Sequence, residues 1–288
     1  MMQKVKDYYS LTKPGVMYGN VLTTMAGFLL ASNGNIDWGL FVATVVGMTF
    51  VIGSACVINN FLDQDIDRLM ERTRTRAIVS GKVSGRGAVI FGTVLGGLGI
   101  LMLAFWVNWL VVAIGLVGFV VYVWLYGVLS KRLSIHGTLV GSISGAMPIL
   151  AGYSAVSGRI DIGSILVFAI LFFWQMPEFY SIAVYRQKEY KKAGVPVISV
   201  VKGIPHTKVQ ILWYTIAFVL STVLLSVSGV TGMTYLVLMG LAGAYFIWLG
   251  VQGLRAKDDD RWARKMFHVS LNILLLFSFL IAIEAWLP

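Results

Sequence analysis

A long apolar segment meets a strongly basic loop at Asn59-Asn60-Phe61-Leu62-Asp63-Gln64-Asp65-Ile66-Asp67. On a helix, Asn59, Asp63 and Asp67 recur at every fourth residue, so their oxygen-bearing side chains form one stripe. Glu71 would extend this stripe by another turn. Like charges at this spacing cost an isolated helix roughly 0.2–0.5 kcal/mol per pair, so a cation should lie against them. Oxygen ligands suit Mg²⁺, which commonly joins one or two carboxylates to substrate phosphates. The stripe therefore predicts a metal-assisted diphosphate site.

The composition indicates a membrane protein. Hydrophobic residues make up 58% of the chain and charged residues 12%, whereas ordinary soluble domains carry about 25% charged residues. A membrane-spanning helix needs ~20 apolar residues, and nine segments approach that length, with ends defined to about 2–4 residues. The nine are Val16–Ala31, Leu40–Asn60, Ala88–Phe105, Leu110–Leu129, Leu139–Val156, Ile162–Val184, Ile211–Val227, Tyr235–Val251 and Val269–Trp286. The second ends at the stripe, so its helix is expected to continue past Asn60 into the loop.

The basic residues predict how the chain is oriented. All Lys and Arg except Arg159 lie in the N-terminal tail or in the loops that follow the even-numbered segments. The positive-inside rule therefore places the N-terminus in the cytoplasm and, after an odd number of spans, the C-terminus outside. The net charge of +10 reports this orientation, and we expect no nucleic-acid partner.

Two loops on the predicted cytoplasmic side carry most of the unusual chemistry. In the first, about residues 61–87, the acidic stripe is followed by Arg72, Arg76 and Lys82. A diphosphate needs this combination, because a metal binds some of its oxygens while Arg and Lys donate to the others. The alternative is a solvated helix with local ion pairs, such as Asp65 with Arg68 and Glu71 with Arg74. That alternative leaves the Asn59, Asp63 and Asp67 stripe unexplained.

The second loop, about residues 185–209, follows an apolar segment that contains Glu178. An ionisable group at membrane depth is costly and usually faces a cavity or a partner. Glu178, Ile182, Tyr185 and Glu189 share one helical face and form a second stripe that runs from the bundle into the loop. Glu178 could instead bond to a neighbouring helix, and Glu189 could pair with Lys192 or Arg186.

Several motifs along most of the chain resemble one family. They are Leu11-Thr12-Lys13-Pro14, Asn59-Asn60-x-x-Asp63-x-Asp65-Ile66-Asp67-Arg68-x-Met70-x-Arg72-Thr73, Gly141-Ser142-x-Ser144-Gly145-Ala146-Met147-Pro148, Trp174-Gln175-Met176-Pro177, Tyr190-x-x-Ala193-Gly194-Val195-Pro196 and Asp260-Arg261-Trp262-Ala263-Arg264-Lys265-Met266-Phe267. Together they resemble the UbiA superfamily of intramembrane prenyltransferases, and within it the bacterial branch that farnesylates heme. The resemblance implies an all-α membrane protein, with nine transmembrane helices in one bundle and a single domain over residues 1–288. Its N-terminus would be cytoplasmic and its C-terminus periplasmic.

The resemblance also implies a reaction and assigns roles to residues. The farnesyl group of farnesyl diphosphate would be transferred to heme B with the help of Mg²⁺. The residues fall into three groups. Asn59, Asp63, Asp67 and Glu189 would be catalytic, the first three as metal ligands; Arg72, Arg76, Lys82 and Lys188 would hold the diphosphate; His136, Tyr153, Glu178, Tyr180 and Tyr185 would line the heme or prenyl cavity. The enzyme would lie in the bacterial inner membrane with its active site facing the cytoplasm, and could pass its product to a heme-using terminal oxidase or to heme A synthase.

This sequence departs from the heme-farnesylating branch at three positions. Glu178 stands where those enzymes commonly carry His, Glu189 where they carry Asp, and Ala77 where they carry Pro. The first change argues against iron ligation by this residue, whereas the second keeps a carboxylate.

Two other functions remain open from the sequence. One is a UbiA-type enzyme that prenylates an aromatic acid or a chlorin. The other is a transporter, whose ion or substrate site would lie near the bilayer midplane. The acids here lie at the membrane edge beside basic residues, which favours an anchored phosphate group over transport.

Overall fold

A computed structural model describes residues 2–287, and this range is helical with no β-strand. Nine helices within it are long and apolar enough to cross a membrane, which confirms the predicted number of spans. They are α2 (Pro14–Ser32), α3 (Trp38–Leu62), α5 (Gly85–Trp106), the continuous run α6 (Trp109–Val120), η1 (Val121–Ser130) and α7 (Lys131–Leu133), then α8 (Gly137–Ser157), α9 (Ile162–Tyr185), α12 (Ile204–Val227), α13 (Met233–Leu254) and α14 (Asp259–Ala282).

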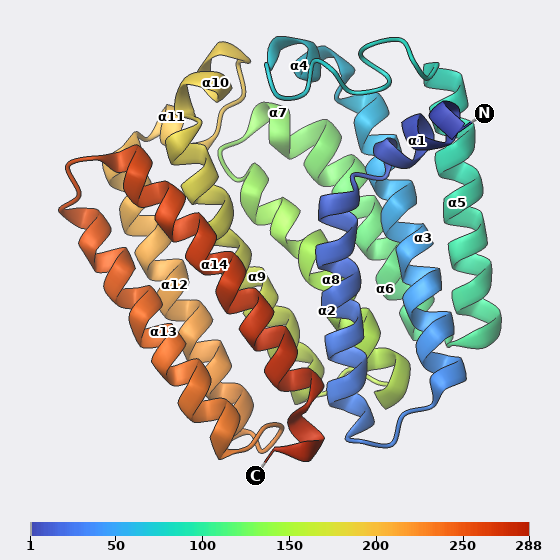
Figure 1. Cartoon of the computed structure of the whole chain (residues 1–288), viewed down its shortest axis with the longest axis vertical. Coiled ribbons are helices and arrows are strands. Elements are labelled where there is room, and N and C mark those ends of the chain that lie inside the picture. Colours follow the sequence, from blue (N-terminus) through green and yellow to red (C-terminus); the bar gives the residue numbers. More distant parts are fainter. Residues whose placement is uncertain (1, 288) are drawn as a thin grey trace.

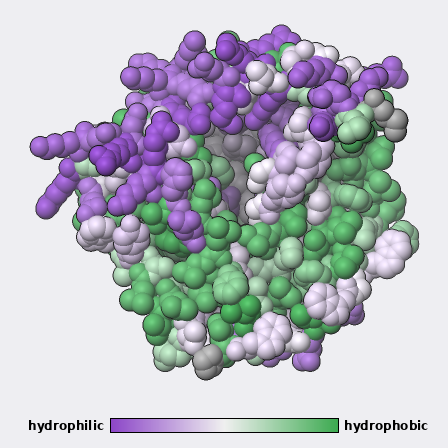
Figure 2. All heavy atoms as spheres, in the orientation of Figure 1, coloured by the Kyte–Doolittle hydropathy of each residue, from purple (hydrophilic) through white to green (hydrophobic). Residues whose placement is uncertain are grey.

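The helices form one bundle, with most of the short helices gathered at one end (Figure 1). The short helices α1 (Met2–Leu11), α4 (Gln64–Leu69), α10 (Gln187–Lys192) and α11 (Ile198–Val201) gather at that end, while η2 (Glu284–Trp286) lies at the other. Figure 2 shows the same division, with a hydrophilic cap above a broad apolar belt. We call the capped end the basic end, because it carries the loops that hold nearly all Lys and Arg residues.

Packing within the bundle places α2 and α8 at its centre. α2 packs against α8, α3 and α14, while α9 packs against α8, α12 and α14. The α3–α5 pair flanks one side and the α12–α13 pair the other. The large buried side chains are apolar, for example Phe28, Phe218 and Phe246. A belt of exposed Leu, Val, Phe and Trp side chains surrounds this core, as expected where lipid replaces water.

Two helices begin earlier than the apolar pattern predicts. α12 begins at Ile204 rather than Ile211, with Pro205 in its first turn, where a missing N–H costs nothing. α14 runs from Asp259 to Ala282 rather than from Val269 to Trp286, because the Asp258 carboxylate accepts a hydrogen bond from the Arg261 N–H and caps the helix. A search for apolar residues overlooks this start, since the first turns of α14 carry both acidic and basic residues.

The α2–α8 crossing is unusually close and depends on two glycines. A Cβ atom at Gly152 would overlap the carbonyl oxygen of Thr24, and one at Gly27 would overlap that of Ile149. Small residues allow helix backbones to approach in this way within a membrane. The crossing therefore fixes α2 against α8 beneath the basic end.

We expect Gly152→Ala to destabilise the bundle by about 1–3 kcal/mol, because the added methyl group must displace backbone rather than a flexible side chain. Thermal unfolding in detergent would measure the change. Gly97→Ala on α5 is the matched control, since open space surrounds that position and alanine has the higher helix propensity. Equal unfolding temperatures for Gly152→Ala and the native chain would contradict the close crossing.

Candidate active site

The predicted stripe is buried at the basic end. Asn59, Asp63 and Asp67 are exposed by only 1%, 1% and 3%. α3 ends at Leu62, yet the Asp63 N–H donates to the Asn59 carbonyl at 3.0 Å and the Asp67 N–H to the Asp63 carbonyl at 2.8 Å. The helical hydrogen-bond pattern thus continues through the break into α4 and keeps the three side chains in register.

Glu71 does not extend the stripe, contrary to the expectation from spacing. α4 ends at Leu69, so the helical register is lost before residue 71. The Glu71 side chain is 88% exposed and lies 3.9 Å from Arg74. This exposed pair is one of the two local ion pairs that the solvated-helix alternative anticipated.

Each member of the stripe meets a basic side chain from a different part of the chain. The Lys13 ammonium, at the start of α2, donates to the Asn59 side-chain oxygen. The Lys131 ammonium donates to Asp63 Oδ2 at 2.6 Å, and the Arg76 guanidinium donates to Asp67 Oδ2 at 2.6 Å. We call this cluster of six side chains the basic chamber. Burial lowers the pKa of Lys13 to about 8, although Asp63 and Cys56 act in the opposite direction.

Asp65 points away from the chamber and anchors α4 to α7. Its carboxylate accepts two hydrogen bonds from the Arg132 guanidinium, at 2.6 and 2.8 Å, in place of the expected pairing with Arg68. Arg132 also donates to the Leu62 carbonyl at 2.7 Å. Its hydrogen bonds lower the pKa of Asp65 to about 2. The stability from this pair is therefore fully present above pH ~3.9, and it is lost only as the pH falls through about 2.

The π-helix η1 forms a wall of the basic chamber. Gly127 lies against the Asn59 amide, since a Cβ atom there would be 3.2 Å from Asn59 Nδ2. The Tyr122 and Tyr126 rings stack with centroids 5.7 Å apart, and the Lys13 ammonium lies 5.9 Å from the Tyr122 centroid. π-Helical turns occur frequently at functional sites.

The two loops singled out from the sequence meet above the chamber. Ile66 and Met70 pack with Val195 in a small apolar cluster that Tyr190 adjoins. Burial and the nearby Tyr126 raise the pKa of Tyr190, while three cations lower it. Those cations are Arg72, Lys131 and Arg186. The charges of Arg72 and Arg186, one from each loop, thus act on the same side chain as the charge of Lys131.

The predicted residues of the second loop have different environments. Glu189 accepts a hydrogen bond from Arg186 at 3.0 Å, one of the two pairings left open by the sequence. Its second oxygen is buried and has no hydrogen-bond partner among residues 2–287. No contact in that range joins Glu189 to the stripe, so its role opposite Asp63 and Asp67 stays a prediction. Lys188 is exposed.

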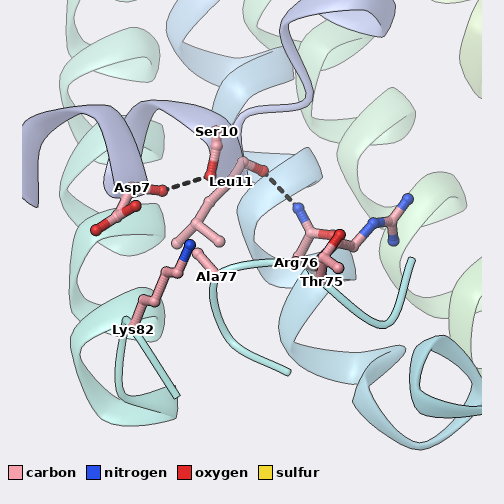
Figure 3. A pocket seen from close by; sticks show the side chains of 8 residues that line it. Asp7, Ser10, Leu11, Thr75, Arg76, Ala77 and Lys82 are labelled. Carbon is pink, nitrogen blue, oxygen red and sulfur yellow. Dashed lines mark hydrogen bonds between the residues drawn. The ribbon is translucent and has the colours of Figure 1, made fainter. Parts of the chain in front are cut away.

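Arg76 and Lys82 share a pocket of about 280 Å³ beside α1 (Figure 3). Asp7, Ser10 and Leu11 form its opposite wall, and the Ser10 hydroxyl donates to the Asp7 carbonyl at 2.6 Å. The pocket lies next to the basic chamber through Arg76. Lys82 is therefore close to the predicted cradle but lies on its α1 side.

Three residues that were predicted to line the heme or prenyl cavity lie away from the stripe. Tyr153 is 16 residues beyond the first residue of α8, roughly 24 Å along the helix, where its hydroxyl lies against Gly163. Tyr180 is buried and packs on Tyr214 of α12, with ring centroids 6.0 Å apart. His136 is exposed and precedes the first residue of α8. The structure does not bring these three side chains to the stripe.

A hollow opens below the hydrophilic cap in the face shown by Figure 2. α2 and α14 border it, and they diverge toward the basic end in Figure 1, with α8 and α9 between them. Tyr185 lies at the basic-end edge of α9, where its ring is 6.2 Å from that of Phe267. The Arg264 guanidinium lies 4.6 Å from the Tyr185 centroid. Arg264 and Phe267 of α14 therefore contact Tyr185 of α9 at the basic end of these two helices.

The stripe has the chemistry of a Mg²⁺ site. Its three side chains offer oxygen donors, and Asp63 Oδ1 is buried without a hydrogen-bond partner among the described residues. Residues 2–287 contain no cluster of three His, Cys, Asp or Glu side chains suited to a metal. A metal here would thus need Asn59 and oxygens from a bound ligand to complete its coordination, as is usual for Mg²⁺.

Comparison with known proteins places the chain in a family. Residues 20–272 match the model of the UbiA prenyltransferase family. The chain belongs to the UbiA prenyltransferase family. Among similar UbiA proteins, the protoheme IX farnesyltransferases of Salmonella arizonae and Citrobacter koseri are 43% and 42% identical to it over 283 residues. Each alignment covers 98% of this chain and 96% of the relative.

Solved UbiA-fold structures agree with the architecture. A digeranylgeranylglyceryl phosphate synthase superimposes with a TM-score of 0.83 at 20% identity, covering 98% of this chain and 99% of that one. A UbiA homologue from Archaeoglobus fulgidus, bound to DMAPP and Mg²⁺, gives 0.72 at 16% identity, covering 96% and 99%. At these identities the likeness shows the shared fold alone.

Replacing Asp67 with Asn should loosen the loop that follows α4, because Arg76 loses a partner that is nearly fully buried. We expect trypsin to cleave after Arg72 or Arg74 about tenfold faster in detergent, equivalent to an opening free energy lower by about 1.4 kcal/mol. Glu71→Gln is the control, since that side chain is exposed. Identical cleavage rates for both variants would mean that the Asp67–Arg76 pair does not hold the loop.

Proposed function

We propose that this chain transfers the farnesyl group of farnesyl diphosphate to a vinyl group of heme B, and that addition of water then gives the hydroxyethylfarnesyl group of heme O. The observation that carries the proposal is the 43% identity, over nearly the whole chain, with proteins named protoheme IX farnesyltransferase. The buried stripe and its three cations supply the chemistry that such a transfer requires.

The basic chamber is suited to bind the diphosphate. Lys13, Lys131 and Arg76 now neutralise the stripe. When Mg²⁺ and the diphosphate bind together, the doubly charged metal neutralises the two carboxylates. The Lys13, Lys131 and Arg76 side chains can then bind phosphate oxygens instead. Mg²⁺ held by Asn59, Asp63 and Asp67 would supply a Lewis acid for the leaving diphosphate. Arg72 and Arg186, near Tyr190, are placed to donate to remaining oxygens.

The walls of the chamber are suited to the allylic cation that forms when the diphosphate leaves. The stacked faces of Tyr122 and Tyr126 adjoin the stripe, and aromatic faces stabilise cations within about 6 Å. Tyr153 and Tyr180, which the sequence suggested for the heme or prenyl cavity, lie away from the stripe. Tyr122 and Tyr126 of η1 are therefore the aromatic side chains proposed for the cation.

The hollow is suited to the apolar parts of both substrates. Burying the farnesyl chain gains ~0.8 kcal/mol per CH₂ group, and the opening between α2 and α14 faces the apolar belt. Heme B can lie in the same opening, with its carboxylates near Arg264 at the basic end of α14. We propose a bacterial inner-membrane location with the basic end in the cytoplasm, where diphosphate is supplied, and transfer of the product to a terminal oxidase or to heme A synthase.

The assay that tests this function uses the purified protein with heme B, farnesyl diphosphate and Mg²⁺, and detects farnesylated heme by mass spectrometry. We expect product only when all three are present, and chelation of the metal should abolish it. If the enzyme prenylates an aromatic acid or a chlorin and leaves heme unchanged, heme is not the acceptor.

Asp63→Ala and Asp67→Ala should each lower turnover at least a hundredfold, because each removes a charge opposed to the metal and leaves a cation unpaired. Glu71→Gln should keep full turnover, since Glu71 lies outside the chamber. Product formation by mass spectrometry, with unfolding temperature as a check on integrity, would measure this. Full activity in either Asp variant would remove the stripe from the reaction.

Orientation can be tested with single cysteines in a Cys56→Ala background. Ser80→Cys lies in the loop after α4, and Ser228→Cys lies between α12 and α13; both positions are exposed. In intact spheroplasts, a membrane-impermeant maleimide should label Ser228→Cys and should reach Ser80→Cys only after lysis. The reverse pattern would place the basic end outside the cell.

A further inference from the structure

Glu178 is a buried carboxyl group that the transfer step does not use. It lies on α9, is 9% exposed, and has no hydrogen-bond or ion-pair partner among residues 2–287. The other buried acids, Asp63 and Asp67, each have a cation within hydrogen-bond distance. Placing an unpaired carboxyl group at membrane depth is costly and usually serves a function. The alternative suggested by the sequence, a bond to a neighbouring helix, is not what the structure shows.

The neighbours of Glu178 on α9 show which way it points. The Trp174 indole donates to the Ser270 carbonyl of α14 at 2.8 Å, and the Gln175 amide donates to the Ser142 carbonyl of α8 at 3.3 Å. At 3.6 residues per turn, Glu178 projects about 40° from Trp174 and about 60° from Gln175, between those two directions. It therefore faces the space between α14 and α8, and α8 lies between the diverging α2 and α14 in Figure 1.

Other side chains on this face support the same direction. Ile182 and Tyr185 follow Glu178 at four and seven residues, which places them on its face. Both are only half-buried, although this side of α9 faces the interior of the bundle. Tyr185 lies about 10 Å nearer the basic end along the helix, beneath Arg264. Along this face of α9, a cation thus lies at the basic end and a lone carboxyl group lies deeper in the bundle.

We infer that Glu178 is the base that removes a proton from the water added to the farnesylated vinyl group, an inference that rests on the proposed function. The vinyl carbon–carbon double bond forms the new bond to C1 of the farnesyl group as the carbon–oxygen bond to diphosphate breaks. Positive charge then remains on the vinyl carbon next to the porphyrin. The water oxygen bonds to that carbon, and one of its protons passes to the Glu178 carboxylate.

The carbocation formed on the vinyl group has two possible fates, and the position of Glu178 favours one of them. It can add water and give the alcohol, or it can lose a carbon-bound proton and give an alkene. A carboxylate with no other partner can hold a water molecule at the cation and accept its proton, which favours the alcohol. A cation from the protein would repel the charged intermediate, and no basic side chain pairs with Glu178 in residues 2–287.

The test compares the products of Glu178→Gln and the native enzyme with heme B, farnesyl diphosphate and Mg²⁺. Gln keeps the shape of the side chain but cannot accept the proton. By mass spectrometry, the ratio of hydroxylated product to product lighter by one water should fall roughly a hundredfold, the scale of general-base catalysis. Release of diphosphate should fall much less. Glu178→Asp, which keeps a carboxylate, should restore a measurable part of the ratio.

Ser181→Ala is the matched control one turn away. Its hydroxyl donates to the Pro177 carbonyl at 2.6 Å, so its loss should change stability without changing the product ratio. An unchanged ratio in Glu178→Gln, or an equal shift in Ser181→Ala, would overturn the inference. If Glu178→Gln does not fold, Glu178→Asp decides. A ratio of hydroxylated to water-lost product close to that of the native enzyme, at a reduced rate, supports the inference, and a ratio at least a hundredfold lower overturns it. Absence of any farnesylated heme from the native enzyme would instead refute the proposed function.

Discussion

The pairing of three buried oxygen-bearing side chains with three cations is the constraint on which the rest of the site depends. Neither set could stay out of water alone, because an isolated buried charge costs several kcal/mol. The partners come from the start of α2, from α7 and from the loop after α4. Their convergence fixes these segments relative to the end of α3. The ion pairs thereby give the polar end of the bundle, which otherwise consists of loops and short helices, a fixed buried site.

Two regions of the bundle differ in character. The basic chamber is polar and lies beneath the loops, whereas the hollow opens onto the apolar belt below the hydrophilic cap. α8 connects them, since Tyr126 of the chamber wall packs against its Gly141 and Gln175 of α9 against its Gly145. The close α2–α8 crossing supports this junction from below. A substrate with a charged head and an apolar tail can therefore occupy both regions at once.

Periodicity in the sequence correctly predicted the nine helices and the common helical register of Asn59, Asp63 and Asp67. These features are local, because they depend on residues three or four positions apart. The partners of the stripe could not be predicted in this way, since Lys13 lies 46 residues from Asn59 and Lys131 lies 68 from Asp63. Lys131 and Arg132 had counted only as signals of orientation. The packing of Tyr180 on Tyr214 of α12 could not be predicted either, because a pattern of aromatic residues does not tell which neighbouring helix each one faces.

The adjacent residues Lys131 and Arg132 carry the same charge but make different kinds of contact. Arg132 forms a fork between the Asp65 carboxylate and the Leu62 carbonyl, and only a planar guanidinium satisfies both acceptors. Lys131 makes one contact, with Asp63, and a flexible point charge can leave it for a phosphate. Arg132 thus holds α4 and the end of α3 against α7, whereas Lys131 is held to Asp63 through a single oxygen. Exchanging Lys131 and Arg132 would preserve composition, net charge and hydropathy, yet it would remove both sets of contacts.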